Sequence, residues 1–177
     1  MNKKLAKRGL FNMTTYHFHP MTEEQAAIIC TWKYGGIYSL YSMDGDDESI
    51  NEMLEEEFYY TVDDENELIG YICIGNSARV PGGYAAGIYE DEQAIDIGLG
   101  LRPDYTGRGK GVEFLAQVMD YIRKLNRGER IQLVVAAFNE RAIKVYERTG
   151  FVRGISFTSK VGEQDTEFIV MRYSPAQ

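Results

Sequence analysis

The 177-residue sequence has few cysteines and no apolar run long enough to cross a membrane. Its two cysteines, Cys30 and Cys73, lie inside apolar segments, and so small a number is not typical of a disulfide-stabilised domain. We interpret both as buried small hydrophobic residues of a cytoplasmic protein. The lack of a long apolar run predicts that no segment spans a membrane, and no metal site is expected.

The sequence also lacks an excess of positive charge. Lys and Arg number 19 against 27 Asp and Glu, which gives a net charge of −8. Nucleic-acid-binding domains usually carry a basic excess, so this balance argues against a nucleic-acid partner. The acidity favours a cationic substrate. It does not exclude an anionic cofactor, because local charge and backbone donors decide whether one binds.

The start of the chain is basic from Met1 to Arg8, but the apolar stretch of a secretory signal does not follow. We interpret residues 1–12 as a loose leader or as a region before an alternative start at Met13. Residues 13–177 are predicted to form a single domain, because this length suits one hydrophobic core.

Helix-like and strand-like patterns alternate along the chain, which predicts an α/β (α+β) domain. Helices are expected from Thr22 toward Trp32, from Asp46 or Asp47, over 112–125 and over 139–148. The segment 79–92 contains Pro81-Gly82-Gly83 and is predicted to be a loop. Strands are predicted over residues 57–62, 68–74, 94–101, 131–137, 151–157 and 166–173, with a further strand near 15–18.

A turn with three glycines in five residues separates the predicted strand 94–101 from the following helix. Such a turn directs backbone N–H groups into one concavity at a helix N-terminus, which suits a phosphate or pyrophosphate. The alternative is a plain connection between a strand and a helix. The candidate phosphate-binding residues are Thr106, Gly107, Arg108, Gly109, Lys110 and Gly111.

Two other phosphate-binding motifs can be tested on this turn. A dinucleotide fingerprint requires G-x-G-x-x-G, but Val112 and Phe114 stand at the third glycine position of the two possible frames. A P-loop requires Ser or Thr after its lysine, and here Gly111 follows Lys110. Neither motif fits, so the turn does not indicate a nucleotide-binding domain of these classes.

A second motif, N-x-x-A-x-x-x-Y-x-x-x-G-F, runs from Asn139 to Phe151. On a helix, Asn139, Ala142 and Tyr146 share one face, because they are separated by three and four residues. A small Ala142 allows a ligand to pass the helix. A phenol at Tyr146, with an ordinary pKa of about 10, is a suitable proton donor to a thiolate leaving group. The alternative is that Tyr146 is an aromatic residue of the core.

The two motifs, in this order and with a buried strand between them, resemble the GNAT superfamily of N-acetyltransferases. The resemblance covers residues 94–173, with one departure, because the family has Gln or Arg where this chain has Thr106. It implies a mixed, mostly antiparallel sheet of six to seven strands. Helices should cover both faces, and the fourth and fifth strands should splay apart.

The resemblance also implies acetyl-CoA as the cofactor. The backbone of the fourth strand would pair with the pantetheine arm, the N–H of Leu99 would bind the thioester carbonyl, and Tyr146 would be the general acid. The implied cofactor-binding residues are Leu99, Gly100, Leu101, Thr106, Gly107, Arg108, Gly109, Lys110, Gly111, Asn139, Ala142 and Tyr146.

The implied reaction is direct attack of an amine on the thioester, which requires that the amine lose its proton. Many family members have Glu at the positions of Ile95 or Val134. Asp96, in a stretch similar to the family's E-I-G-Y, is the candidate catalytic base, and the alternative is a carboxylate that only hydrogen-bonds a neighbouring strand or loop. The candidate acceptor-binding residues are Trp32, Tyr34, Tyr38, Tyr84 and Glu90.

The resemblance therefore implies an N-acetyltransferase that moves an acetyl group from acetyl-CoA to a primary amine of a small molecule or peptide. We expect a monomer or homodimer without nucleic-acid or membrane partners. The alternative is a non-catalytic, acyl-CoA-sensing member of the same fold that binds a protein partner.

Overall fold

The computed structural model describes residues 13–125, 127–128 and 130–174, so the predicted leader 1–12 lies outside the described residues. The strands of this part are β1 (His17–Pro20), β2 (Phe58–Val62), β3 (Leu68–Ile74), β4 (Ile95–Leu101), β5 (Ile131–Ala136), β6 (Val152–Val161) and β7 (Gln164–Tyr173). Its α-helices are α1 (Glu23–Ile29), α2 (Asp47–Glu55), α3 (Pro81–Ala85), α4 (Gly111–Lys124) and α5 (Glu140–Thr149), and its 3₁₀ helices are η1 (Gly36–Tyr41), η2 (Asn76–Ala78) and η3 (Pro103–Tyr105).

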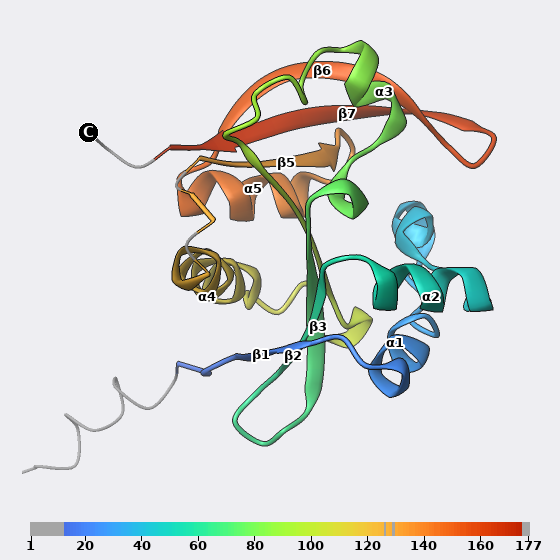
Figure 1. The fold of residues 1–177 in the computed structure, drawn as a ribbon, viewed down its shortest axis with the longest axis vertical. Coiled ribbons are helices and arrows are strands. Elements are labelled where there is room, and N and C mark those ends of the chain that lie inside the picture. Colours follow the sequence, from blue (N-terminus) through green and yellow to red (C-terminus); the bar gives the residue numbers. More distant parts are fainter. Residues whose placement is uncertain (1–12, 126, 129, 175–177) are drawn as a thin grey trace, which may run out of the picture.

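The strands form one sheet of seven described strands in the order β1-β2-β3-β4-β5-β7-β6 (Figure 1). Neighbouring strands run antiparallel except for β4 and β5, which run parallel. The β4–β5 register joins just Ile95 to Ile131 and Asp96 to Gln132, and the two strands then diverge. The predicted mixed sheet and the splay between its fourth and fifth strands are confirmed.

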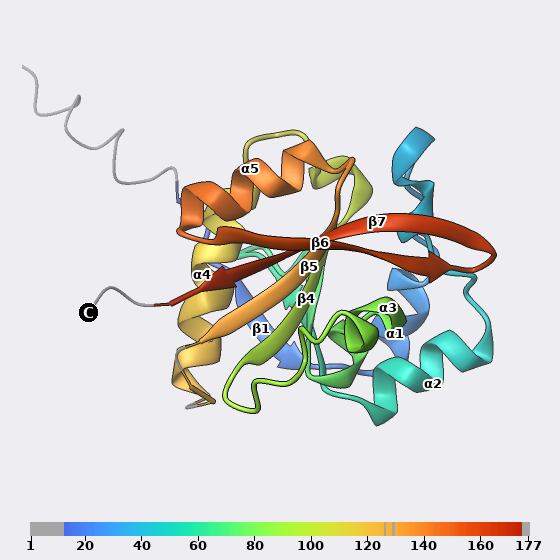
Figure 2. The same ribbon diagram turned by 90° about the horizontal axis from the view of Figure 1, so that it is seen from above.

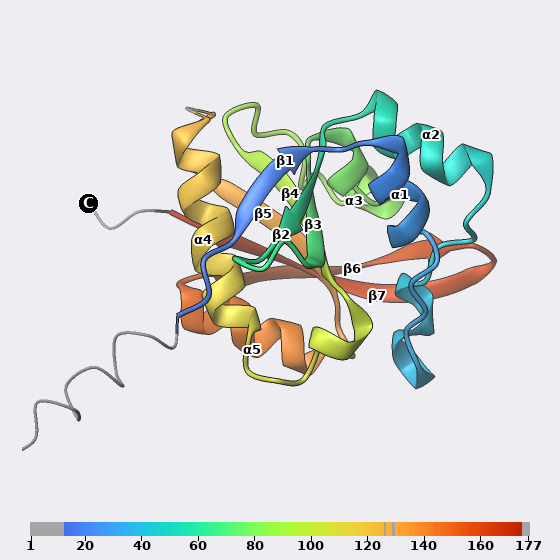
Figure 3. The same ribbon diagram turned by 90° about the horizontal axis from the view of Figure 1, so that it is seen from below.

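Helices lie on both faces of the sheet, as predicted (Figures 2 and 3). Successive side chains of a strand point to opposite faces. On β3, Ile72 belongs to the main core beneath α4, whereas Tyr71 and Cys73 belong to a second core beneath α1 and α2. Both cysteines are free and buried, as predicted from their apolar surroundings. None of the described helices combines the length and apolarity needed to cross a membrane.

Local capping explains where three of the helices begin. The side chain of Thr22 accepts a hydrogen bond from the N–H of Gln25 (3.3 Å) before α1, and that of Asp46 accepts one from Ser49 (2.9 Å) before α2. The first of these helices is shorter than predicted, because it ends at Ile29 rather than near Trp32. The third, α5, begins at the predicted cap residue and ends at a glycine in the left-handed region.

The segment 79–92 is not the loop that its Pro-Gly-Gly sequence predicts, because it contains α3. Pro81 occupies the first turn, where its fixed φ suits a helix. The glycines serve a close approach between chain segments. A Cβ at Gly82 would lie 2.2 Å from the carbonyl oxygen of Thr158 on β6, and the Gly82 N–H donates to the hydroxyl of Ser159 (2.9 Å).

Candidate active site

The divergence of β4 and β5 opens a cavity of about 560 Å³. Its walls come from the edge of β4, the glycine-rich turn, α5 and the segment around η1. The lining includes most of the predicted cofactor-binding residues, namely Leu99, Gly100, Leu101, Thr106, Gly107, Gly109, Lys110, Gly111, Asn139, Ala142 and Tyr146. Arg108 is exposed and does not line it.

The edge of β4 that faces the cavity carries free backbone groups. The carbonyl of Asp96 accepts a hydrogen bond from Gly75 (2.8 Å), and the N–H of Arg102 donates one to Ile69 (2.8 Å). Because backbone groups alternate in direction along a strand, the even-numbered residues of β4 bond to β3 and the odd-numbered ones point toward β5. The β5 register ends at Asp96, so the N–H of Leu99 points into the cavity.

The glycine-rich turn presents backbone donors to the same cavity. Gly107 and Gly109 have φ values of +73° and +72°, which residues with a Cβ rarely adopt. Lys110 precedes α4 without making a side-chain cap, so the first N–H groups of this 14-residue helix are open to a ligand. A Cβ at Gly111 would lie 2.8 Å from a methyl group of Val145. The turn therefore fits an anionic group such as a pyrophosphate.

Cationic side chains surround the turn. Lys110 lines the cavity, and so do three basic residues of α5. These three, Arg141, Lys144 and Arg148, are spaced by three and four residues and therefore share one helix face. The sequence analysis did not single them out, although their periodicity beside the second motif was a usable signal. Together these residues give the turn the positive charge that a phosphate group requires.

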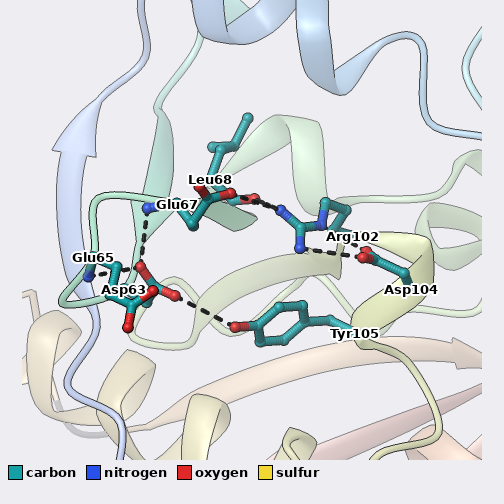
Figure 4. A network of polar contacts seen from close by, with 7 residues as sticks. All are labelled: Asp63, Glu65, Glu67, Leu68, Arg102, Asp104 and Tyr105. Atoms are coloured by element: carbon teal, nitrogen blue, oxygen red, sulfur yellow. Dashed lines mark hydrogen bonds and ion pairs between the residues drawn. The ribbon is translucent and has the colours of Figure 1, made fainter.

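A network before the turn holds its entry in place (Figure 4). Arg102 donates to the carboxylate of Asp104 (2.6 Å) and to the carbonyl of Leu68 (2.9 Å). The hydroxyl of Tyr105 donates to the carboxylate of Asp63 (3.4 Å). The Arg102 guanidinium also lowers the pKa of the Asp104 carboxyl. These contacts tie η3 to the β2–β3 turn.

Thr106 stands at the family's Gln or Arg position and is engaged within the turn itself. Its hydroxyl donates to the carbonyl of Pro103 (2.6 Å), and its N–H is 3.3 Å from the same oxygen. This arrangement favours a role in holding the turn over a direct contact with an anion.

The second motif lies on α5 with the predicted face toward the cavity. Asn139 caps the helix by accepting from the N–H of Ala142 (3.2 Å), and its amide donates to the hydroxyl of Tyr41 (3.0 Å). Tyr146 lines the cavity, and burial together with nearby Tyr41 raises its pKa well above the ordinary value. The phenol is therefore neutral and able to donate a proton at physiological pH.

Asp96, the candidate base, is buried and fully engaged. The residue is 4% exposed and does not line the cavity. One carboxylate oxygen accepts from Arg79 (2.7 Å) and the other from Gln132 (2.8 Å). Gln132 is held in turn by Arg172 (2.9 Å). These contacts favour a structural role for Asp96, because a direct base must reach its substrate and this carboxylate faces Arg79 and Gln132 instead of the cavity.

The five predicted acceptor residues divide into two groups. Tyr34 and Tyr38 line the cavity. Trp32 is 8% exposed and packs in the second core, Tyr84 of α3 lies against Tyr89 with its ring tilted, and Glu90 is exposed. The last three do not line the cavity.

The segment around η1 closes over the cavity through its phenols. The hydroxyl of Tyr34 donates to the carbonyl of Leu101 (2.6 Å), on the free edge of β4. Burial raises the pKa of Tyr34 to about 12. The ring of Tyr38 lies beneath the guanidinium of Arg141, 4.2 Å from its centre. Tyr41 and Tyr71 also line this cavity, and the sequence analysis did not assign a role to Tyr71.

A family model for the acetyltransferase (GNAT) family matches residues 24–151, which is most of the chain. The chain belongs to the GNAT family. Members of this family transfer acyl groups from acyl-CoA, and the splayed strands, glycine-rich turn and α5 described above lie in the region that the GNAT model matches. No curated protein sequence matches the chain.

Solved GNAT structures share the fold at low sequence identity. A chimera of the spermidine N-acetyltransferase SpeG from Vibrio cholerae and hSSAT is 16% identical, with a TM-score of 0.65 over 90% of this chain and 95% of that one. A GNAT acetyltransferase from Bacillus anthracis is 15% identical, with a TM-score of 0.64 over 90% and 94%. The ribosomal-protein-S5-alanine acetyltransferase from Vibrio fischeri is 17% identical, with a TM-score of 0.60 over 91% and 96%.

Proposed function

We propose that this GNAT protein transfers an acetyl group from acetyl-CoA to a primary amine of a small molecule or peptide by direct attack. The observation that carries the proposal is the continuous series of open backbone donors. It begins at the free edge of β4 beside Leu99 and continues through the glycine-rich turn to the N-terminus of α4. This series matches an elongated ligand with a carbonyl at one end and phosphates at the other.

In this proposal the free edge of β4 pairs with the pantetheine arm as an added strand would. The Leu99 N–H binds the thioester carbonyl, where negative charge develops during attack. The turn from Gly107 to Gly111 holds the pyrophosphate, and Lys144 with its basic neighbours on α5 contributes charge. Acetyl-CoA supplies the activated acetyl group.

The transfer forms one bond and breaks another. The neutral amine nitrogen attacks the carbonyl carbon, so a C–N bond forms as the C–S bond breaks. Tyr146 donates its proton to the departing sulfur and regains one from solvent. The nitrogen gives up its extra proton to water. Asp96 was the predicted base, but Arg79 and Gln132 occupy both of its oxygens, so we propose that proton removal proceeds through water.

The names of structural neighbours support an amine acceptor. They include enzymes named for acetylation of spermidine and of the alanine of ribosomal protein S5. At 17% identity or less, these likenesses support the class of acceptor and leave the individual compound open.

The proposal is tested by a thermal-shift screen with acetyl-CoA, CoA, ATP and NAD, followed by CoA release with a panel of amines. A ligand at 100 times its Kd stabilises the folded state by about 2.7 kcal/mol, so acetyl-CoA should raise the Tm by several degrees. ATP and NAD should have no comparable effect. Stabilisation by acetyl-CoA without CoA release from any amine would support the non-catalytic sensing alternative.

A further inference from the structure

A second cavity, of about 250 Å³, adjoins the first beneath α2. The two share three lining residues, Tyr71, Cys73 and Ser77. The remaining lining of the second cavity is Ser42, Met43, Asp44, Ser49, Glu52, Met53 and Phe58. We call this space the α2 cavity. Because Tyr71 lines both cavities and packs against Gly100, next to Leu99, the α2 cavity adjoins the proposed position of the thioester.

The inner end of the α2 cavity is marked by Tyr71. Its ring lies directly over Gly100 of β4, where an added Cβ would be 2.4 Å from Cε1 and 2.9 Å from the hydroxyl oxygen. This position is one residue from Leu99, whose N–H is the proposed thioester donor. Burial raises the pKa of Tyr71, and the nearby phenols of Tyr34 and Tyr146 add to the effect, so the hydroxyl is neutral. A bound amine can therefore hydrogen-bond to it beside the reacting carbonyl.

One wall of the α2 cavity, which we call its floor, is apolar and is made by Met53, Phe58 and Cys73. Met53, Phe58 and Cys73 are each less than a tenth exposed, and the ring of Phe58 lies 6.2 Å from that of Tyr71. Such a wall suits methylene groups and disfavours a charge beside it, while the hydroxyls of Ser42, Ser49 and Ser77 belong to the rest of the lining. An amine at the inner end is therefore favoured in its neutral form, which is the form that attacks.

The outer end of the α2 cavity carries two carboxylates, Asp44 and Glu52, and both residues are exposed. Within the described part of the chain, neither makes an ion pair with a basic side chain. The nearby cation is Lys33, and its ammonium donates to the carbonyl of Met43 (2.5 Å). The field of Glu52 reaches the floor, where it adds to the rise that burial causes in the pKa of Cys73.

Asp44 and Glu52 differ from the neighbouring acidic residues because they line the α2 cavity. The same helix also carries Glu48 and Glu55, which are exposed and do not line the cavity. The α2 cavity thus has a neutral hydrogen-bonding group at its inner end, an apolar floor and unpaired negative charge at its outer end. A matching ligand would carry a neutral amine at one end, methylene groups in the middle and a positive charge at the other end.

We propose that the α2 cavity binds the acceptor, and that the acceptor is a linear alkyl amine carrying a second cationic group. The reacting amine lies beside Tyr71, the methylenes cross the apolar floor, and the second cation pairs with Glu52 and Asp44. This inference rests on the proposed acetyltransferase function and adds the class of substrate to it.

The test compares acetylation of 1,4-diaminobutane and butylamine by the full-length protein with saturating acetyl-CoA. The diamine should have a kcat/KM at least tenfold higher, mainly through a lower KM, and the preference should shrink as salt is raised. Glu52→Gln should raise the KM for the diamine about tenfold while leaving the Tm and the acetyl-CoA Kd close to wild type. Glu48→Gln, on the same helix outside the cavity, is the matched control and should change neither constant.

The possible outcomes distinguish a failure of this inference from a failure of the proposed acetyltransferase function. If acetyl-CoA binds and butylamine is acetylated as efficiently as the diamine, or if Glu52→Gln and Glu48→Gln behave alike, the assignment of the α2 cavity is overturned and the proposed function stands. A preference for peptide N-termini that Glu52→Gln does not alter overturns it in the same way. If acetyl-CoA does not bind, or no amine releases CoA, the proposed catalytic function fails and the inference fails with it.

Discussion

The two sides of the active-site region are built from different chemical groups. On the side of β4, the glycine-rich turn and α4, the groups open to a ligand are mainly backbone N–H groups, with the side chain of Lys110 beside them. On the side of η1 and α2, they are side chains, namely phenols and carboxylates. A backbone site depends on glycines and on where strands and helices end. A side-chain site depends on which distant residues the fold brings together, so related chains can change it one residue at a time.

The two sides also differ in charge. Basic residues such as Lys110 and Lys144 surround the turn, whereas Asp44 and Glu52 border the α2 cavity. A chain with a net charge of −8 thus keeps a local positive region for an anionic ligand. The separation allows an anionic donor and a cationic acceptor to approach from opposite ends without competing for one site.

The largest effect should come from Tyr146→Phe. This substitution removes the hydroxyl that we propose as the general acid and keeps the aromatic ring that lines the cavity. Loss of general-acid catalysis typically lowers the rate by about 100-fold or more. We expect kcat to fall by about that factor and the acetyl-CoA Kd to stay within about twofold. Steady-state kinetics and isothermal titration measure the two constants. An unchanged kcat would remove the acid role, and Tyr59→Phe, remote from the cavity lining, is the control.

The dependence of kcat/KM on pH tests the same general-acid role of Tyr146. The acceptor ammonium must lose its proton, so kcat/KM should rise with pH. A raised pKa means that the phenol of Tyr146 stays protonated as the pH passes its ordinary value of 10.0. The wild-type kcat/KM should therefore show no decline up to pH 10 in a buffer where the fold is intact by circular dichroism. A decline centred near pH 9 would indicate a more acidic group as the proton donor.

Asp96→Asn tests whether this carboxylate supports the fold or the reaction. Removing the charge leaves Arg79 without its partner in a site where Asp96 is almost fully buried, which should lower the free energy of unfolding by about 2–3 kcal/mol. Below the Tm, kcat should change little. Denaturant unfolding and kinetics measure both. The control is Asp91→Asn, since its ion pair with Arg130 is exposed and should contribute under about 1 kcal/mol. A stable but inactive Asp96→Asn protein would restore the base role.

Lys144→Gln should moderately weaken the binding of acetyl-CoA, because it removes one positive charge beside the glycine-rich turn. Losing one charge-assisted contact to a phosphate costs about 1.4 kcal/mol, which corresponds to about a tenfold higher Kd for acetyl-CoA. The effect should diminish at high salt. Lys124→Gln, at the exposed end of α4, should leave the Kd unchanged. Equal affinities for the two variants would place the phosphates elsewhere.

The smallest effect is expected for Thr106→Val. The Thr106 hydroxyl already donates to Pro103, so its removal costs about 1 kcal/mol of turn stability and no direct ligand contact. The Kd for acetyl-CoA should rise by less than about threefold. A rise of about 30-fold would show that the hydroxyl reaches the phosphate after rearrangement.

The backbone side of the site was predictable because its signals are local. Glycine spacing and the helix face of Asn139, Ala142 and Tyr146 can be read within a few residues of chain. The other side was not, because its contacts are distant in sequence. Asp96 looks like a free carboxylate until Arg79 and Gln132 meet it from other segments.

The missed features have the same physical origin. Tyr71 belongs to a strand whose pattern indicates only burial, and Glu52 is one of several acids on an amphipathic helix. The Pro-Gly-Gly of α3 has the composition of a loop, yet it is held as a helical turn by Gly82 packing on β6. Contacts with residues that are distant in the sequence cannot be predicted from the local sequence pattern.

The hydrogen bond from Tyr34 to the Leu101 carbonyl has a consequence for binding energetics. A ligand that pairs with this carbonyl first displaces the phenol, so one hydrogen bond is exchanged for another and the net gain there is small. The released hydroxyl is a phenol, which is neutral at physiological pH and needs no counterion. Leu101 therefore selects for the alignment of a ligand along β4, while the strength of its binding comes from contacts elsewhere in the cavity.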